Sequence, residues 1–494
     1  MQHPLIYEIN ARWWLRELAE CYGRPIHLGS LPEPEFVRWR DQGFTHIWLM
    51  GLWPTGPLSR QRVLSDPVQI EAWRNILPDF HESDVAGSPY ALADYMVSNT
   101  LGGKSALKTF RQQLHTHGLK LLLDFVPNHV GLDHPWLAER PDLFVQSPVE
   151  VPETLPQQTP AGLRWLAHGK DPCFPAWTDT VQLDYRRADT RSAMLEVLES
   201  VAELCDGVRC DMAMLVLNEV FARTWAKFVC PTPAAAGSEF WSEAIGRVKQ
   251  ARPDFLFLAE VYWDLEVRLQ ALGFDYTYDK GLYDRLVTPQ FQEVQRHLAS
   301  VSPRFIKASA HFLENHDEAR IAAILGPKEH LAAALTILGL PGLRLLHEGQ
   351  LTGARVRTPV QLGRRPPEPP VPEIVRLYGQ LLKAIRHSAV GQGNGLVLQP
   401  REAWPGNPTC ENFVTVQWQA QPPDFDLVAV NLAPHRSQCY APLSLANLPD
   451  HNWSLCDVLG EERYERRGDD LSSQGLYLDL PPLGAQLFHF EPVG

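Results

Sequence analysis

The chain has 494 residues, of which 45% are hydrophobic and 21% charged, a composition typical of a folded globular protein rather than a disordered, collagen-like or coiled-coil chain. With 45 Lys and Arg against 58 Asp and Glu, the formal charge is −13 and no basic run stands out, so neither nucleic acid nor an anionic membrane is an expected partner. The length predicts roughly three folding units, or one large barrel with appendages.

Neither a targeting segment nor a membrane span is predicted. The N-terminus lacks a charged segment followed by an apolar one, so we expect no secretory signal and a cytoplasmic protein. The longest nearly apolar stretch, 331–343, is shorter than the roughly 18 to 20 residues that a membrane span needs. The eight cysteines have no metal-binding spacing, which predicts reduced thiols and no zinc site.

Eight short apolar runs rich in β-forming residues recur along the chain, with room for a helix between them. Apolar residues at helical spacing support such helices at 104–117, 190–204 and 331–338. This alternation is typical of strand–helix units around a parallel sheet, and eight units fit a closed (β/α)8 TIM barrel, an α/β fold, better than an open doubly wound sheet. The runs are 6–9, 46–50, 119–126, 207–211, 255–260, 274–278, 308–313 and 343–347.

Two segments break this alternation. The connection after the third run is rich in Pro and aromatic residues and too long to lack structure of its own, so we expect a small inserted domain at 130–181. Near the C-terminus the pattern changes to alternating strands, which predicts a β-sandwich domain at 393–494. The barrel domain then comprises 1–129 and 182–392.

Polar residues follow several of the apolar runs, at the end of the barrel where active sites of this fold lie. Three are carboxylates: Asp211, Glu260 and Asp317 end or follow the fourth, fifth and seventh runs, so they should converge on one mouth. Because no Cys or His metal set accompanies them, they indicate acid/base or nucleophilic chemistry on a neutral polar substrate. Glycoside hydrolysis fits that arrangement.

A retaining mechanism needs an ionised nucleophile and a protonated acid roughly 5 to 5.5 Å apart, a distance that adjacent strands can supply. Arg209 lies two residues before Asp211, on the same face of the strand, and its guanidinium should keep that carboxylate ionised. Glu260 follows an apolar run and precedes VYW at 261–263, surroundings that we expect to raise its pKa and favour the proton-donor role.

Each of these residues also has an ordinary structural interpretation when taken alone. A strand-end Asp or Glu is more often a helix cap or a surface ion pair. Asn128 and His129 could form a turn, and Tyr90 could be a packed loop aromatic. The combination, in order on four of the predicted strands, favours the functional interpretation.

With this combination the chain resembles the α-amylase family of glycoside hydrolases and transglycosylases over most of its length. The family's four short signatures appear in order, and a fifth segment resembles the loop after its second strand. They are DFVPNH at 124–129, GVRCD at 207–211, AEVYW at 259–263 and NHD at 315–317, with YALADY at 90–95 as the loop.

The resemblance implies a role for each matching residue. Asp211 would be the nucleophile, Glu260 the general acid/base, and Asp317 the carboxylate that grips sugar hydroxyls and stabilises the transition state. Trp263 lies in a predicted strand-end loop, where its ring could stack on a sugar. The further substrate-binding residues are Tyr90, His129, Arg209 and His316.

The chain also departs from the family pattern. Many starch-hydrolysing members carry a Lys-His pair after the nucleophile that contacts the sugar on the leaving-group side, where this chain has Met214 and Leu215, so we expect an unusual acceptor subsite. Family members often bind calcium where the insert meets the barrel. Asn128 is the matching candidate, but the insert lacks a dense set of oxygen ligands. We expect no required cofactor and leave calcium open.

A local basic cluster stands out in this acidic protein. Its members are Arg355, Arg357, Arg364 and Arg365. One interpretation is a solvated or salt-bridged loop, which is usual for surface arginine. The other is a donor or acceptor phosphate held by bidentate arginine.

The predicted function is that of a retaining α-glycosidase or transglycosylase acting on α-linked glucose oligosaccharides, with α-1,4 maltooligosaccharides as the expected substrate. The alternatives are a phosphate-dependent or maltosyl-transferring member of the same family and a catalytically silent amylase-like module that binds glycans. A nucleotide-binding enzyme is not expected, because GKS at 103–105 lacks the glycine five positions earlier that a phosphate loop needs. The sequence does not predict the oligomeric state.

Overall fold

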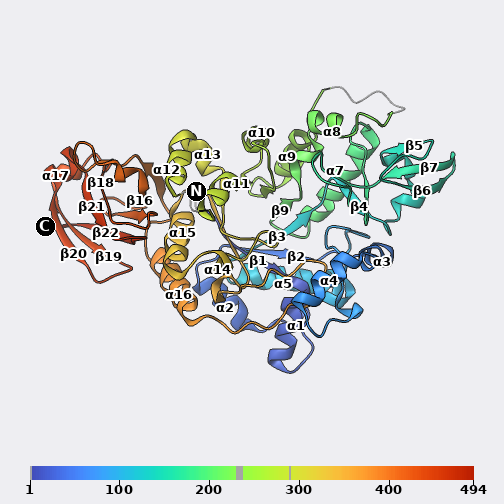
Figure 1. Ribbon diagram of the computed structural model, residues 1–494, viewed down its shortest axis with the longest axis horizontal. Helices are drawn as coiled ribbons and strands as arrows, with labels where there is room; N and C mark the ends of the chain where they lie inside the picture. Colours follow the sequence, from blue (N-terminus) through green and yellow to red (C-terminus); the bar gives the residue numbers. More distant parts are fainter. Residues whose placement is uncertain (1–2, 230–236, 289–290, 494) are drawn as a thin grey trace.

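A closed barrel of eight parallel strands forms the centre of the molecule in the computed structural model, which describes residues 3–229, 237–288 and 291–493 (Figure 1). The strands follow one another around the barrel in sequence order, and β1 pairs with β13 to close it. Each of the eight predicted runs supplies one strand, so the predicted TIM barrel is confirmed. The strands are β1 (Leu5–Asn10), β2 (His46–Met50), β3 (Lys120–Phe125), β9 (Gly207–Cys210), β10 (Leu256–Ala259), β11 (Tyr276–Tyr278), β12 (Ser309–His311) and β13 (Leu343–His347).

Helices surround the barrel and bury their apolar faces against it. The side chain of Asn10 accepts a hydrogen bond from the Arg12 N–H at the start of α1, and Gly23 ends that helix with a left-handed φ of 61°. Among the described helices, none is both long enough and apolar enough to cross a membrane. The larger helices of the wall are α1 (Ala11–Tyr22), α2 (Glu33–Asp41), α5 (Gly103–Thr116), α7 (Ala188–Ala202), α9 (Phe240–Ala251), α12 (Phe291–Ser300), α15 (Pro327–Gly339) and α16 (Pro372–Arg386).

Shorter helices complete the connections between the strands. They are α8 (Asn218–Thr224), α10 (Glu266–Ala271), α11 (Lys280–Leu286), α13 (Pro303–Lys307) and α14 (Ile321–Ile324).

The chain makes two excursions from the barrel. One follows β2 and contains α3 (Pro57–Leu64) and α4 (Pro67–Ile76), which were not predicted because they bury few apolar residues, chiefly Val63 and Trp73. The other lies between β3 and β9, at the far end of the molecule from the C-terminus in Figure 1. Its elements are β4 (His129–Gly131), α6 (Trp136–Glu139), β5 (Gln146–Ser147), β6 (Thr154–Thr159), β7 (Gly162–Ala167) and β8 (Thr180–Gln182).

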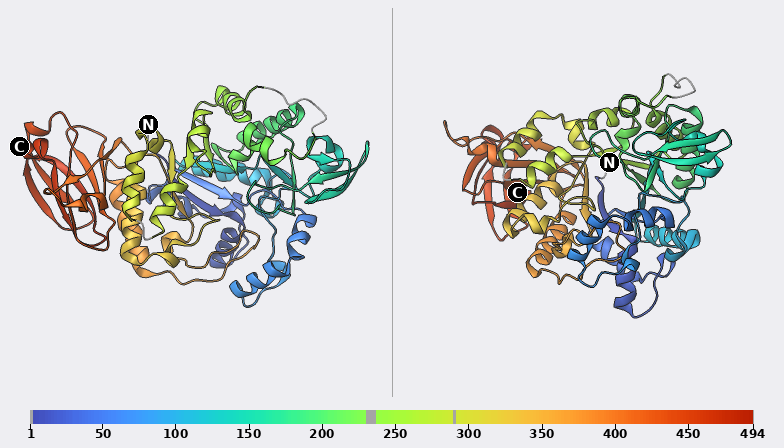
Figure 2. Two further views of the ribbon diagram at one scale, coloured as in Figure 1. Left: turned by 45° about the horizontal axis from the view of Figure 1, so that its top comes forward. Right: turned by 45° about the vertical axis from the view of Figure 1, so that its right-hand side comes forward.

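The C-terminal region is a sandwich of a six-stranded and a three-stranded antiparallel sheet, as predicted (Figure 2). On β17, Leu427 faces the other sheet, whereas Val428 packs on Gly339 of α15, so this strand is buried on both faces. The six-stranded sheet therefore joins the sandwich to the barrel. Its strands are β14 (Asn394–Leu398), β16 (Phe413–Gln419), β17 (Phe425–Asn431), β19 (Asn452–Asp457), β20 (Arg463–Arg467) and β22 (Ala485–Val493); the other sheet holds β15 (Arg401–Glu402), β18 (Ser437–Ala441) and β21 (Leu476–Leu480), with α17 (Gly468–Ser473) beside them.

Candidate active site

The barrel ladder places two of the predicted carboxylates side by side. Asp211 directly follows β9, and its N–H donates to the carbonyl of Phe125 at 2.9 Å. Glu260 directly follows β10, and its N–H donates to the carbonyl of Cys210 at 3.1 Å. Because both residues continue adjacent parallel strands at their carboxyl ends, their side chains open into the same mouth of the barrel.

Arg209 connects these carboxylates. Its side chain is fully buried, with Nη1 2.8 Å from Oδ1 of Asp211 and Nη2 2.7 Å from Oε2 of Glu260. A third carboxylate, Asp124 on β3, lies 3.5 Å from Nη1. The guanidinium also lies 5.2 Å from the ring centre of Tyr90. One guanidinium thus lies close to three buried carboxylates, so its positive charge compensates their negative charge only in part.

Burial raises the pKa of Asp211 to about 7 and that of Asp124 to about 6, although the charge of Arg209 opposes both shifts. Removal from water disfavours the charged form of a carboxyl group, and the like charges nearby add to that effect. We therefore expect this cluster to exchange a proton near neutral pH, as acid/base chemistry requires.

The surroundings of Glu260 differ from the sequence expectation. Besides Arg209, its carboxylate accepts hydrogen bonds from the N–H of Met212 at 2.7 Å and from the hydroxyl of Tyr262 at 2.9 Å. The expectation of apolar surroundings was wrong because neighbours along an extended chain point to opposite sides. Val261 is buried, and polar partners approach Glu260 from other parts of the chain.

A second group of predicted residues meets around His316. Its Nε2 lies 2.8 Å from the Tyr90 hydroxyl and 3.0 Å from Oδ2 of Asp317, and its Nδ1 lies 2.5 Å from Oε1 of Glu8. Burial opposes ionisation of Asp317, but the charge and hydrogen bond of His316 outweigh it and lower the pKa of Asp317. The Asp317 side chain remains 43% exposed, so it can reach a bound molecule.

His129 and Asn128 lie beside this group. His129 is buried against Trp177, with ring centres 5.1 Å apart, and burial lowers its pKa to about 4, so it is neutral at pH 7. The amide oxygen of Asn128 accepts a hydrogen bond from Gln182 at 3.0 Å, and its amide nitrogen donates to Gln182 at 3.2 Å. The amide oxygen of Asn128 thus has one hydrogen-bond partner and a second lone pair that could still face a cation. Among the described residues no group of three or more His, Cys, Asp or Glu could hold a metal ion.

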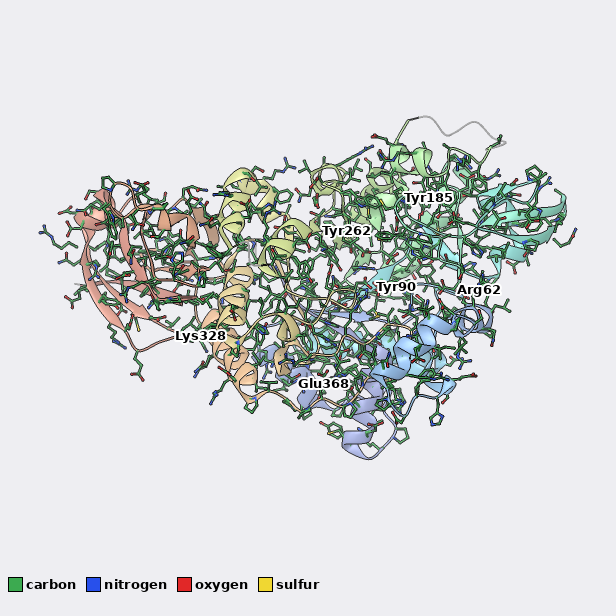
Figure 3. All side chains as sticks on the ribbon, in the orientation of Figure 1. Arg62, Tyr90, Tyr185, Tyr262, Lys328 and Glu368 are labelled. Carbon is green, nitrogen blue, oxygen red and sulfur yellow. The ribbon has the colours of Figure 1, made fainter. Side chains whose placement is uncertain are left out.

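A pocket of about 500 Å³, which we call the rim pocket, is lined by Met212 and Tyr262, the two residues that hydrogen-bond the Glu260 carboxylate. Its other walls include Phe174 of the excursion after β3, Trp263 and residues of α11. Trp263 is 39% exposed. Met212 and Trp263 have positive φ angles of 41° and 65°, which non-glycine residues adopt only when their surroundings hold them there. Figure 3 shows Tyr262 and Tyr90 near the middle of the molecule.

The basic cluster consists in part of ion pairs. Arg364 makes two hydrogen bonds to Asp84, at 2.7 and 2.8 Å, and Arg365 makes two to Glu17, at 2.6 and 2.7 Å. Of the two interpretations left open by the sequence, the salt-bridged loop therefore holds for these two arginines. The side chains of Arg355 and Arg357 are exposed.

Two residues of this site were given no role from the sequence: Glu8 on β1, and Asp124 on β3, which was noted only as the first residue of a signature. Both are charged residues inside otherwise apolar strand runs, and both are buried. A charge in that position is a usable signal, because the barrel interior accepts it only where a partner is present. Each has its partner on a distant part of the chain, His316 for Glu8 and Arg209 for Asp124.

Known proteins resemble this chain in sequence and in fold. A family model described as the alpha amylase catalytic domain matches residues 76–361. The alpha-amylase MalA of Haloarcula japonica is 26% identical over 284 residues, which cover 56% of this chain and 38% of that protein. The alpha-1,4-glucan:maltose-1-phosphate maltosyltransferase of Cereibacter sphaeroides is 24% identical over 249 residues, which cover 48% of this chain and 30% of that protein. The alignments thus span less than half the length of either relative.

Solved structures show the same fold over the whole chain. A noncanonic maltogenic alpha-amylase, AmyB from Thermotoga neapolitana, superposes with a TM-score of 0.67 at 18% identity and 99% coverage of both chains. An alpha-amylase from Geobacillus thermoleovorans, solved with acarbose, superposes with a TM-score of 0.66 at 17% identity, covering 100% of this chain and 99% of that one.

Proposed function

The chain belongs to the α-amylase family, and on that premise we propose that it is a retaining α-glycosidase or transglycosylase of α-linked glucose oligosaccharides. The observation that carries the proposal is the shared guanidinium: Asp211 and Glu260 both lie within 2.8 Å of Arg209. Two carboxyl groups on one guanidinium favour the spacing of roughly 5 to 5.5 Å of retaining enzymes over the roughly 6.5 to 9.5 Å of inverting ones.

In the first step a carboxylate oxygen of Asp211 attacks the anomeric carbon of the bound sugar. The bond from that carbon to the glycosidic oxygen breaks, and Glu260 gives its proton to the departing oxygen. The products are a glycosyl ester on Asp211 and a free leaving sugar. Arg209 stays beside both carboxylates and offsets the charge that appears on Glu260.

In the second step Glu260, now ionised, takes a proton from the incoming nucleophile, and the glycosyl–Asp211 bond breaks. Water gives hydrolysis, whereas a sugar hydroxyl gives transfer. The residues at the mouth support either outcome. The rim pocket is lined by Met212 and Tyr262, which hydrogen-bond Glu260, so it could receive an acceptor sugar, and Trp263 could stack on the ring of that sugar.

The remaining predicted residues act on the sugar that is cleaved. Asp317 would accept hydrogen bonds from its hydroxyls, and Tyr90 would pack against the ring as it flattens toward an oxocarbenium ion. His129, neutral because of its burial, would contribute a hydrogen bond without a charge. The neutral imidazole of His129 and the exposed carboxylate of Asp317 could both hydrogen-bond the hydroxyl groups of an uncharged sugar.

A transfer reaction is the second candidate, and the surroundings of the nucleophile favour it. Met214 and Leu215 are buried and offer no polar contact on the leaving-group side. A phosphate-dependent reaction has less support, because Arg364 and Arg365 are already paired with carboxylates. A silent glycan-binding module has no need of all three carboxylates.

The test is a product profile. The protein is incubated with maltotriose and with maltoheptaose, with and without inorganic phosphate, and the products are separated by chain length. Chains longer than the substrate indicate transfer, shorter chains alone indicate hydrolysis, and sugar phosphates indicate phosphorolysis. If the wild type leaves both substrates unchanged while Asp211→Asn still binds them, the binding-module alternative replaces the proposal.

A further inference from the structure

Glu8 is a buried charge that the steps above do not use. It lies on β1, its side chain is fully buried, and its Oε1 lies 2.5 Å from Nδ1 of His316. The second oxygen, Oε2, has no hydrogen-bond partner among the described residues. Burying a carboxylate with one oxygen unsatisfied lowers stability, so packing alone does not explain a glutamate here.

The other nitrogen of His316 also faces an acceptor, since Nε2 lies 3.0 Å from Oδ2 of Asp317. A neutral imidazole carries one proton and can donate to only one of these carboxylates, whereas the imidazolium donates to both. Burial opposes that charge, but Asp317 and Glu8 outweigh it and raise the pKa of His316 well above its usual value. The Tyr90 hydroxyl, 2.8 Å from the same Nε2, then serves as an acceptor.

We infer that Glu8 is a positioning residue of the active site, which holds His316 as an imidazolium through Nδ1 so that Nε2 keeps Asp317 and Tyr90 in place for the sugar. The inference rests on the proposed function, because the sugar is what Asp317 and Tyr90 would contact. Glu8 does not touch the sugar itself. It acts through His316. In the same way, a carboxylate that accepts a hydrogen bond from a metal-binding histidine fixes the protonation and the orientation of that imidazole.

Several other groups face this pair, and none replaces Glu8. Trp48 packs edge-on to the His316 ring, with centres 5.6 Å apart, and supplies an apolar wall. Burial and the nearby Arg320 lower the pKa of His347, so its imidazole is uncharged and cannot take the place of the Glu8 carboxylate. Apart from Glu8, Asp317 and Tyr90 themselves, the titratable and charged groups whose electrostatic influence reaches Glu8, His316 or Asp317 include Asp124, Arg209, Tyr262, Tyr278, His347 and Arg357.

The first test measures the proton on His316 directly. In Glu8→Gln the amide oxygen can still accept a hydrogen bond but carries no charge, so the imidazolium loses a stabilising partner. We expect the ¹⁵N resonances of His316, assigned by their loss in His316→Gln, to titrate at a pH at least about one unit lower than in the wild type. The inference would be overturned if His316 titrated at the same pH in the variant and in the wild type, or if the wild-type His316 titrated near its usual pKa. This readout does not depend on enzyme activity.

The second test is a pH profile of kcat/KM on maltoheptaose. Because Glu8→Gln loses the imidazolium as pH rises, its alkaline limb should move to lower pH by about one unit, and activity at pH 8 should fall about 10- to 100-fold. Glu8→Asp, which keeps the charge, should restore the position of the limb. A uniform loss at every pH, with the limb unmoved, would indicate a merely structural role and contradict the inference.

The matched control is Glu348→Gln, which removes a buried charge beside β13 that hydrogen-bonds the indole N–H of Trp13 and the N–H of Asn10 and not His316. It should leave the alkaline limb where it is. Wild-type protein that neither cleaves nor elongates maltoheptaose would refute the proposed function instead, and the resonances of His316 would still report on Glu8.

Discussion

The molecule contains two clusters of arginine and carboxylate side chains that differ in how their charges are matched. In the outer cluster, Arg364 makes two hydrogen bonds to Asp84 and one to the carboxylate of Asp79. Arg365 makes two hydrogen bonds to Glu17 and lies 3.8 Å from Glu348. In the barrel mouth a single arginine, Arg209, faces three buried carboxylates. Each outer arginine has one carboxylate partner that is open to solvent, whereas the excess negative charge of the mouth is buried and needs a proton to neutralise it.

The contrast shows that the same residue types make a structural tie or a reactive site according to how far their carboxylates are buried. In the outer cluster, solvent reaches one carboxylate partner of each arginine and screens the pairing, so its contribution to stability is modest. The mouth cluster retains an unbalanced charge where water is excluded, which costs stability but makes proton transfer possible. Strained residues such as Met212 and Trp263 flank the mouth cluster.

The largest expected effect is that of Asp211→Asn. Without a nucleophile the covalent route is closed, and kcat should fall about 10⁴-fold or more. Because burial raises the pKa of Asp211 to about 7, well above its unfolded value, ionising it destabilises the fold as pH rises. The variant should therefore melt at a higher temperature than the wild type at pH 8, with the gain lost below pH 4. A lower melting temperature at pH 8 would contradict this account of the cluster.

A smaller loss is expected from Arg209→Lys. An ammonium keeps the charge but cannot contact Asp211 and Glu260 in the same fixed fork, so kcat on maltoheptaose should fall about 100-fold. The matched variant Arg365→Lys, in the outer cluster, should keep kcat within about two-fold, since Arg365 pairs with Glu17 and Glu348 and with none of the three predicted catalytic carboxylates. Equal losses in the two variants would erase the distinction between the clusters.

The pH profile of the wild type provides a third comparison. The nucleophile must be ionised, and its pKa is raised, so kcat/KM should fall as pH decreases through a value well above the ordinary aspartate pKa of about 3.9. Steady-state rates between pH 4 and 9 measure this limb. A limb centred near pH 4 would mean that Arg209 compensates Asp211 fully.

The smallest effect is expected from Arg364→Gln. It removes the hydrogen bonds to Asp84 and Asp79 and should lower the melting temperature by about 1 to 3 °C, with activity unchanged. Calorimetry and a maltoheptaose assay measure both quantities. A substantial loss of activity, or a requirement for phosphate that this variant abolishes, would restore the phosphate-site interpretation of the basic cluster.

Much of the fold could be predicted from the sequence because the barrel strands are apolar runs of strand length. The β16 and β17 strands were equally recognisable. The helices α3 and α4 were missed. The first has almost no apolar stripe, and the stripe of the second, Ile70, Trp73 and Ile76, packs in a small separate core and not on the barrel. Local periodicity thus identifies elements that pack on the main core and overlooks those that fold around a few side chains.

The candidate site was predictable where residues end strands and not where partners meet across the barrel. Asp211 and Glu260 could be located from the runs that precede them. Glu8 and His316 are in contact although they are 308 residues apart in the sequence, and Arg365 and Glu17 are 348 residues apart. At such separations the sequence pattern carries no information on contact. The expectation of an apolar environment for Glu260 was wrong for the same reason, because its polar partners come mostly from other segments of the chain.

The most direct test of the central claim is to trap the covalent intermediate. In Glu260→Gln, an α-glucosyl fluoride can form the ester on Asp211 because fluoride leaves without a proton, whereas breakdown of the ester is slowed. Mass spectrometry of the digested protein should then show one glucosyl residue added to the peptide that contains Asp211. Fluoride release without an adduct, or an adduct on another residue, would contradict the account.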